Sequence, residues 1–380
     1  MKFFKLDEYL GLLEQLVNID SNSFDSKGID KVADIMAQKY KELGLYVTKY
    51  RFDEKAGYCL EVRNNIENKE IDVLMVGHID TVLPTGTVEK RPFKKQDNIA
   101  YGPGIIDMKS GIVSMYYIVK EIVKNNIPIN FCLAINSDEE ISSRYSNVWI
   151  SNLGKISKCA FIFEPARKSG ALVSDRKGLA RFEVKFHGKY SHAGVNPQDG
   201  ASAIHEMGYW ISKIVPLNNY SVGTTVNVGI VSGGVGANTV AENAKCEIDV
   251  RFEVIEEFNK IEEFLYELQK NNFIQGVTIS IKRLGFRPPM NSNSKAKELM
   301  HIMTEEGKKV NVDVKWVKTG GGSDGNFISF EGCPVLDAVG PVGDGAHGDN
   351  EMIWIDSIEP RTKMVYTTIV NIYNLNILNK

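Results

Sequence analysis

Four apolar residues, Val73–Val76, are followed directly by Gly77 and His78 and, two residues later, by Asp80. This pattern predicts a short buried strand that Gly77 ends, with His78 and Asp80 just past its carboxyl end. In an open α/β sheet, ligands bind at the carboxyl ends of the strands, where the flanking helices leave a crevice. The stretch therefore predicts a sheet and also the edge of it at which a site would lie.

Two further apolar runs end in acidic residues in the same way. Residues 129–135 lead into Glu139 and Glu140, and residues 158–163 lead into Glu164. Carboxylates that gather in one crevice repel one another and raise each other's pKa, unless cations lie among them. Taken singly, each of these residues is more often a hydrogen-bonded surface group. Their coincidence at several strand ends favours a cation site.

The order of the predicted elements indicates two domains. A helix predicted over about 109–124 separates two parallel-looking strands, as in a doubly wound α/β sheet. After about residue 175 the order becomes βαββαβ, and from about 290 the α/β pattern resumes. At 380 residues the chain also exceeds the usual size of one core. We predict a mostly parallel, doubly wound α/β domain, 1–175 and 290–380, with an inserted ferredoxin-like α+β domain over 176–289.

Composition excludes several classes of protein. The chain is 43% hydrophobic and 24% charged, its net charge is −3, and it has no block of Lys and Arg. A nucleic-acid partner is therefore not expected. Charges come too early at the N-terminus for a signal peptide, and no apolar run reaches the ~18 residues that span a bilayer. We expect a soluble, cytoplasmic protein without a membrane partner.

The five cysteines are scattered and form no Cys-x-x-Cys pair. This spacing argues against disulfides and against a zinc site built from thiolates. Cys132 and Cys159 lie in apolar runs and are predicted to be small buried hydrophobes. The ligands of any metal must then be histidine and carboxylate.

A charge count favours two divalent ions. Asp107, Glu140 and Glu164 supply −3, while His78 and His347 are neutral as ligands. Two divalent cations supply +4, and one bridging hydroxide brings the sum to zero. Imidazole nitrogen with carboxylate oxygen and no sulfur suits Zn²⁺, with Co²⁺ or Mn²⁺ as alternatives. Asp107 precedes a predicted helix, so it could instead be an N-cap.

Seven short motifs occur in order along nearly the whole chain. They are His78-Ile-Asp80-Thr, Gly102-Pro-Gly-Ile-Ile-Asp107-Met-Lys, Ser137-Asp-Glu139-Glu140, Glu164-Pro165, Ser191-His192-Ala-Gly, Thr319-Gly-Gly-Gly-Ser-Asp324, and His347 near Glu351. Together they resemble the di-zinc carboxypeptidase, aminoacylase and desuccinylase family, closest to its glutamate carboxypeptidase branch. Each motif alone is a weak signal, whereas the ordered set is specific.

The resemblance implies a ligand set for two Zn²⁺ ions per subunit. Asp107 would bridge both ions, His78 and Glu164 would complete one site, and Glu140 and His347 would complete the other. It also implies a cis peptide bond after Asp107, although the following residue is not proline.

The resemblance also implies catalytic roles. Asp80 would accept a hydrogen bond from the second ring nitrogen of His78 and so orient the ring. Glu139 would be the general base that takes a proton from the attacking water. Adjacent side chains on an extended chain point to opposite sides, so Glu139 could face the water while Glu140 faces a metal.

The remaining implied residues would bind the substrate. By resemblance, His192 stabilises the oxyanion and reaches the active site of the other subunit of a homodimer, and Asn238 lines that same site. Arg287 resembles the residue that grips the free carboxylate of the substrate, since a planar guanidinium suits bidentate binding. Gly321 and Gly322 would let the backbone approach the substrate closely.

The resemblance predicts a zinc-dependent, glutamate-carboxypeptidase-like hydrolase. A metal-bridging hydroxide would cleave an amide bond next to a free carboxylate, in a small peptide or an N-acyl amino acid. The alternative is an N-acyl amino acid deacylase of the acetylornithine deacetylase, succinyl-diaminopimelate desuccinylase or aminoacylase type. No motif identifies the side-chain pocket, so the natural substrate stays open.

Two other classes of protein are weaker alternatives. A catalytically silent binding protein would not need all five candidate ligands together with Glu139. A nucleotide-binding protein would use the loop 102–104, but this loop lacks both the dinucleotide fingerprint and a correctly spaced Walker lysine.

Overall fold

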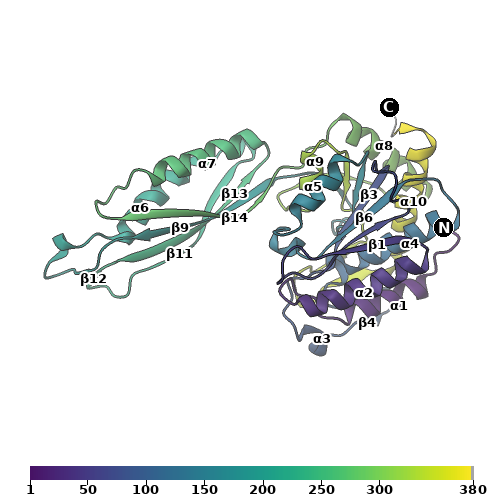
Figure 1. The fold of residues 1–380 in the computed structure, drawn as a ribbon, viewed down its shortest axis with the longest axis horizontal. Helices are drawn as coiled ribbons and strands as arrows, with labels where there is room; N and C mark the ends of the chain where they lie inside the picture. Colours follow the sequence, from purple (N-terminus) through teal and green to yellow (C-terminus); the bar gives the residue numbers. More distant parts are fainter. Residues whose placement is uncertain (378–380) are drawn as a thin grey trace. The chain divides into compact units, whose positions relative to one another are not determined.

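The structure is a computed structural model that describes residues 1–377, and these residues divide into two compact units (Figure 1). The first unit comprises Met1–Asp175, Asn291–Thr319 and the chain from Ser323 on. The second comprises Arg176–Met290 and the short segment Gly320–Gly322. Over the described residues, no helix combines the length and the apolar character that crossing a membrane requires.

An eight-stranded mixed sheet forms the centre of the first unit. In spatial order its strands are β1 (Tyr46–Tyr50), β2 (Cys59–Arg63), β6 (Phe131–Asn136), β3 (Val73–His78), β7 (Ala160–Ile162), β16 (Val335–Asp337), β8 (Leu172–Arg176) and β15 (Trp316–Thr319). The four strands β6, β3, β7 and β16 are parallel, whereas β1, β2 and β8 pair antiparallel with their neighbours. The predicted α/β class with a mostly parallel central sheet is confirmed.

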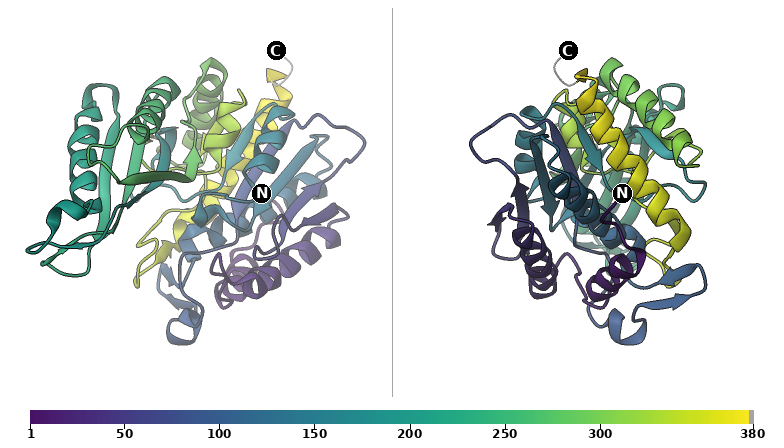
Figure 2. Two further views of the ribbon diagram at one scale, coloured as in Figure 1. Left: turned by 60° about the vertical axis from the view of Figure 1, so that its left-hand side comes forward. Right: turned by 90° about the vertical axis from the view of Figure 1, so that its right-hand side faces the viewer.

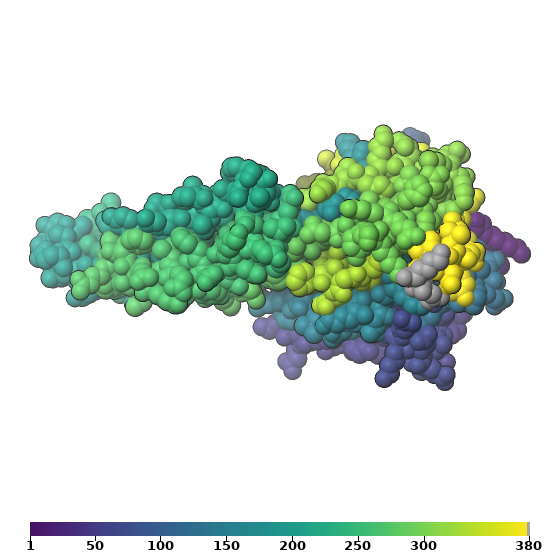
Figure 3. Space-filling view, turned by 90° about the horizontal axis from the view of Figure 1, so that it is seen from above, coloured from purple at the N-terminus to yellow at the C-terminus, as the bar shows by residue number. Residues whose placement is uncertain are grey.

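Helices cover this sheet. They are α1 (Leu6–Val17), α2 (Ser26–Glu42), α4 (Ser110–Lys124), α5 (Asn147–Lys155), α8 (Ser294–Lys309), α9 (Gly325–Phe330) and α10 (Ile358–Asn374). The short helix α3 (Thr87–Lys90) has no buried residue and lies outside this layer. Apolar residues of α1, α2, α4, α8 and α10 join one core with alternate residues of the central strands. Helices α8 and α10 lie side by side (Figures 2 and 3), and α5 packs against α9.

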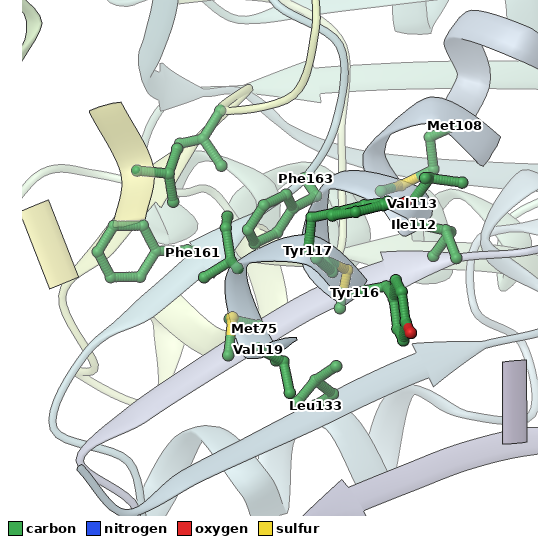
Figure 4. Close-up of a cluster of buried hydrophobic side chains, with 14 of the residues drawn as sticks. Met75, Met108, Ile112, Val113, Tyr116, Tyr117, Val119, Leu133, Phe161 and Phe163 are labelled. Carbon is green, nitrogen blue, oxygen red and sulfur yellow. The ribbon is translucent and has the colours of Figure 1, made fainter. Parts of the chain in front are cut away.

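The core of the first unit centres on α4 and the three central strands. Met75 of β3 is level with Leu133 of β6 and Phe161 of β7, and all three side chains are buried (Figure 4). Ile112 and Tyr116 of α4 belong to the same cluster. Burial of each such side chain contributes about 1.5–3 kcal/mol relative to exposure. This packing fixes α4 and therefore the turn that precedes it.

The prediction that Gly77 ends its strand is wrong. Gly77 lies inside β3 and pairs with Ile135, so that His78 is the last strand residue. A Cβ at Gly77 would lie 2.7 Å from the Met108 side chain and 2.9 Å from that of Ile112. The glycine therefore serves close packing of the strand under the turn before α4 and does not interrupt the strand.

Gly111, in the first turn of α4, allows the helix to approach β7 closely. A Cβ there would lie 2.2 Å from the carbonyl oxygen of Phe163, a backbone atom that cannot rotate away. We expect Gly111→Ala to lower the free energy of unfolding by about 1–3 kcal/mol through overpacking. The matched control is Gly11→Ala in α1, where no atom lies within 4 Å, and this change should stabilise by about 0.4–1 kcal/mol. Urea unfolding checks both values, and equal effects would contradict the close approach.

A second, four-stranded sheet of the first unit carries the late segment of the chain. Its order is β17 (Gly343–Asp344), β18 (Met352–Trp354), β5 (Ile99–Tyr101) and β4 (Lys94–Gln96), and every neighbouring pair is antiparallel. The loop between β17 and β18 contains His347. Pairing of β18 with β5 brings this loop beside the residues that follow β5.

The second unit is a four-stranded antiparallel sheet with two helices. Its elements in chain order are β9 (Gly178–His187), β10 (Ser191–His192), α6 (Ala203–Ile214), β11 (Thr225–Gly233), β12 (Thr239–Val240), β13 (Asn243–Phe252), α7 (Ile255–Gln269) and β14 (Thr278–Arg287). The sheet order β11-β13-β9-β14 is that of a ferredoxin-like βαββαβ unit. Apolar residues of α6 and α7 bury one face of the sheet. The predicted inserted α+β fold is confirmed.

Candidate metal centre

Three parallel strands of the first unit place acidic and imidazole side chains at one edge of the sheet. His78 is the last residue of β3, and it pairs in register with Asn136, the last residue of β6. Glu139 and Glu140 follow β6 after two residues, and Glu164 follows β7 after one. Parallel pairing of β3 with both neighbours aligns these carboxyl ends, as the strand-end pattern in the sequence predicted.

Two loops bring the remaining residues to the same edge. Asp107 lies in the turn Ile105–Lys109, directly before α4, and the peptide bond that follows it is cis. That cis bond was predicted by resemblance and is confirmed. His347 lies in the loop between β17 and β18 and adopts a left-handed backbone conformation, with φ of 65°.

Asp107 stands between the two histidines. Its Oδ1 lies 3.2 Å from Nε2 of His78, and its Oδ2 lies 3.1 Å from Nε2 of His347. Glu164 Oε1 is 3.7 Å from the His78 nitrogen, and Glu140 Oε2 is 3.4 Å from the His347 nitrogen. Ligand atoms that each lie about 2.0–2.2 Å from a tetrahedral zinc ion are about 3.3–3.6 Å apart. Asp107 therefore has a histidine nitrogen at zinc-ligand spacing on each side, and ligand atoms of His78, Asp107 and Glu140 all lie within 4.8 Å of one another.

The charges of this cluster favour cations. Burial favours the neutral form of Asp107, but hydrogen bonds from His347 and His78 outweigh it and lower the pKa of the carboxyl below its usual value. Hydrogen bonds with Asp107 and Glu140 raise the pKa of His347 to about 10. Burial opposes charge on His78, yet bonds with Asp107 and Asp80 raise its pKa well above the ordinary value. The carboxylates thus hold positive charge at both rings, where a metal ion would displace the protons.

Glu140 supplies a second indication of a metal. Burial raises the pKa of its carboxyl to about 7, and the neighbouring Asp107 charge adds to the shift, while the hydrogen bond with His347 opposes it. Its Oε1 is buried without a hydrogen-bond partner among the described residues. A buried oxygen of this kind is costly unless a partner satisfies it. A divalent ion would do so, and the donor set fits one.

Asp80 is completely buried and contacts both His78 and the backbone of Glu139 and Glu140. Its carbonyl oxygen is 3.0 Å and its Oδ1 3.3 Å from Nδ1 of His78, so that Nδ1–H donates and Nε2 is left to face Asp107. Ser23 Oγ donates to Asp80 Oδ2 at 2.7 Å. One aspartate therefore contacts the His78 ring through both its carbonyl and its carboxylate, which favours the tautomer that leaves Nε2 facing Asp107.

The prediction that Glu139 and Glu140 lie on extended chain is wrong. They begin a 3₁₀ turn, Glu139–Ile141, because their backbone N–H groups donate to Oδ1 and Oδ2 of Asp80, each at 3.1 Å. The first N–H groups of a helical turn lack partners within the turn, and a carboxylate satisfies them. With about three residues per turn the two side chains still diverge. A carboxylate oxygen of Glu139 lies within 4.8 Å of ligand atoms of His78 and Glu164.

His192 and Asn238 lie together within the second unit. His192 ends β10 and pairs with Thr239 of β12, and the carbonyl of Asn238 accepts the N–H of Ala193 at 2.9 Å. Both His192 and Asn238 are exposed. The structure thus places both residues at one end of a short antiparallel ladder.

The other residues predicted to bind the substrate, Arg287, Gly321 and Gly322, also lie in the second unit. Arg287 ends β14 and is 2% exposed, and its Cδ would lie 3.0 Å from a Cβ placed on Gly322. Arg176 Nη1 donates to the carbonyls of Gly321 and Gly322, at 3.2 and 3.3 Å. A Cβ at Gly321 would contact no atom within 4 Å, so this glycine borders open space. Arg251 forms a two-bond pair with Asp249.

Two residues near the centre escaped the sequence analysis. Ser23, which donates to Asp80, lies in a loop with no distinguishing pattern. Glu351 is buried, and its carboxylate accepts backbone N–H groups of the Asp107 turn. It appeared in the sequence only as a neighbour of His347. An acidic residue four positions after a candidate histidine ligand was the available signal.

Known proteins resemble this chain over nearly its full length. Carboxypeptidase G2 from Pseudomonas sp. (strain RS-16) is 28% identical over 373 residues, which cover 95% of this chain and 88% of that protein. The crystal structure of aminopeptidase PepT from Bacillus cereus has a TM-score of 0.78 at 22% identity and covers 97% of this chain and 99% of its own. The structure of a metallo-carboxypeptidase from Sulfolobus solfataricus has a TM-score of 0.77 at 19% identity and covers 97% of this chain and 100% of its own.

At such low identities the two solved structures show the shared fold alone. The family assignment comes from the sequence. The model of the family described as peptidase family M20/M25/M40 matches residues 74–371, which include every strand end of the metal centre. The chain belongs to peptidase family M20/M25/M40.

Proposed function

We propose that this chain is a metal-dependent, carboxypeptidase-like hydrolase that cleaves an amide bond next to a free carboxylate in small peptides or N-acyl amino acids. The observation that carries the proposal is Asp107, which directs one oxygen to each of two histidines that each have a further carboxylate beside them. Two Zn²⁺ ions per subunit suit these ligands, with Co²⁺ or Mn²⁺ as alternatives. When bound, such ions lower the pKa of a water molecule and polarise a carbonyl.

Glu139 is the general base of this proposal. Its backbone is fixed by Asp80, which also orients His78, so the base and one ligand share a single support. A carboxylate held beside a ligand group can take the proton of an attacking water and pass it to the leaving nitrogen. Such a group must stay free of the metal, which is why Glu140 and not Glu139 is assigned as the ligand beside His347.

The second unit would bind the substrate. Arg287 suits bidentate binding of a free carboxylate, and the backbone at Gly321 and Gly322 would line the same subsite. Burial of Arg287 beside Gly322 favours a strong interaction with an anion, since little water competes there.

We also propose that the protein is a homodimer through the second unit. Strand β11 is at the edge of its sheet, so no strand of that sheet pairs with its outer backbone N–H and C=O groups. Ile230 and Val231 on this strand are 51% and 54% exposed, and Val235 just after it is 90% exposed. Pairing with a second copy would cover both features. His192 and Asn238 of one subunit would then line the metal centre of the other.

Mixing two inactive variants tests this sharing of sites. His192→Ala and Glu139→Ala should each be nearly inactive as pure proteins. After unfolding or subunit exchange at equal amounts, half of the dimers are mixed, and each mixed dimer has one working site of two. We therefore expect complementation between subunits to restore about a quarter of wild-type activity. Activity assays and gel filtration measure the result. No regain at any mixing ratio would contradict a shared site.

A substrate screen tests the function itself. Metal-free protein is reloaded with Zn²⁺, Co²⁺ or Mn²⁺ and assayed for release of free amino acid from dipeptides, N-acyl amino acids and peptide C-termini. We expect hydrolysis only with metal, and much more efficient hydrolysis where a free carboxylate adjoins the amide. Blocking that carboxylate as an amide should raise KM strongly. Faster release of acetyl or succinyl groups than of peptide residues would favour the deacylase alternative.

The cysteines suit a cytoplasmic location, which we include in the proposal. All five are free thiols and are buried, and free thiols persist in a reducing compartment. Cys132 and Cys159 are completely buried, as predicted for small hydrophobes.

A further inference from the structure

Glu351 is a buried carboxylate that the proposed chemistry does not use. Its side chain is 2% exposed and accepts three backbone N–H groups of the turn that carries Asp107. Oε2 accepts from Gly104 at 2.8 Å, and Oε1 accepts from Ile106 at 3.0 Å and from Asp107 itself at 3.2 Å. Burial raises the pKa of this carboxyl to about 7, whereas the three N–H donors favour its ionised form. The carboxylate therefore fixes the backbone of Asp107 directly.

The same residue also fixes the loop of His347. The backbone carbonyl of Glu351 accepts the N–H of Gly102 at 3.2 Å, and the next residue, Met352, pairs with Tyr101. His347 lies only four residues before Glu351, in a loop that a bond from Gly348 N–H to Gly345 O closes at 2.9 Å. One residue thus joins the segment of Asp107 to the segment of His347.

We propose that Glu351 is a positioning residue that sets the Asp107 carboxylate against His347, and through them the affinity of the metal pair. The proposal rests on the proposed function, because it assumes that these two side chains are ligands. Their 3.1 Å contact joins residues 240 positions apart in the chain. The side-chain bonds of Glu351 add a second link between the two loops, beside the pairing of β18 with β5. A shift of either loop would change the spacing of the ligands without removing any of them.

A glutamine cannot reproduce this arrangement. Its side chain has one accepting oxygen and one donating NH₂ group, whereas the turn presents N–H donors to both positions. In either orientation, the NH₂ group faces at least one backbone N–H. Glu351→Gln therefore disturbs the turn at almost constant side-chain volume, which makes it the appropriate variant.

The experiment compares metal binding by wild type, Glu351→Gln and Asp349→Asn. Asp349 is the matched control, since it lies two residues away with a side chain that is 93% exposed and 3.5 Å from Arg91. Metal-free proteins are titrated with Zn²⁺ against a competing chelator, and the Co²⁺-loaded forms are examined by visible absorption. We expect Glu351→Gln to bind at least one Zn²⁺ about 10–100-fold more weakly, with an altered Co²⁺ spectrum, and Asp349→Asn to match wild type.

Melting of the metal-free proteins separates positioning from a general loss of stability. Weaker Zn²⁺ binding by a Glu351→Gln protein that is folded without metal supports the proposal. If wild type binds two Zn²⁺ and folded Glu351→Gln binds them equally well, the inference is overturned while the proposed function stands. If wild type binds no metal, the proposed function itself fails.

A second variant decides the matter if Glu351→Gln does not fold. Glu351→Asp keeps the charge but is one methylene shorter, so it cannot reach all three N–H groups, and Zn²⁺ binding should weaken to an intermediate degree. Wild-type affinity in Glu351→Asp would overturn the inference and leave Glu351 a purely structural residue.

Discussion

Replacing Glu139 by alanine should lower kcat/KM by about 10²–10⁴-fold while the protein keeps its two metal ions. The loss is the usual contribution of a positioned general acid–base group. Metal should remain because His78, Asp107, Glu164 and the residues of the second site are unchanged. Steady-state kinetics with elemental analysis of the same sample measures both quantities.

The neighbouring glutamate is the control for this change. Glu140→Ala removes the carboxylate that lies 3.4 Å from His347, so it should weaken metal binding first and activity as a consequence. Excess Zn²⁺ should restore part of the activity of Glu140→Ala and none of that of Glu139→Ala. Because Glu139 also lies within reach of His78 and Glu164, metal loss in Glu139→Ala would show that the two roles are assigned the wrong way round.

Replacing Asp107 by asparagine should have the largest effect on the metal centre. Asparagine has the same shape but only one accepting oxygen, so it cannot serve both ligand groups. We expect the metal content to fall from two ions per chain to one or none. Changes to residues that only support metal ligands lower activity by up to about 10²-fold, so loss of a shared ligand should lower it by at least that much. Elemental analysis after dialysis and kinetics in excess Zn²⁺ check the expectation.

A distant aspartate controls for the loss of one charge. Asp313 has an 82% exposed side chain near Lys315, and Asp313→Asn should leave metal content and rate unchanged. If Asp107→Asn still held two ions per chain and worked at the wild-type rate, Asp107 could not be a shared ligand, and the proposed centre would need a different arrangement.

The features that could be predicted from the sequence depend on local regularities. Apolar runs such as Val73–Val76 indicate buried strands because side chains alternate across a sheet, and helical spacing identifies α4 in the same way. The βαββαβ order of the inserted fold follows from the same periodicities. The resemblance of the ordered motifs added what periodicity cannot supply, including the cis bond after Asp107.

The departures show where local rules end. Glycine often ends a strand, yet Gly77 continues β3. Met108 and Ile112, from a later segment, occupy the space that a Cβ at this position would take. Glu139 and Glu140 form a turn because Asp80, about sixty positions earlier, offers an oxygen to each N–H. Both outcomes depend on which distant atoms arrive beside them.

The sequence by itself determined the class of fold, the candidate ligand types and their places at strand ends, because these follow from periodicity and residue chemistry. Only the tertiary structure decided that Asp107 directs one oxygen to each histidine and that Glu351 supports its turn. The reason is physical: the bonds from Glu351 to that turn join residues 244 to 247 positions apart, and no local preference specifies such a pairing. It is set by the packing of α4 and by the register of β18 with β5.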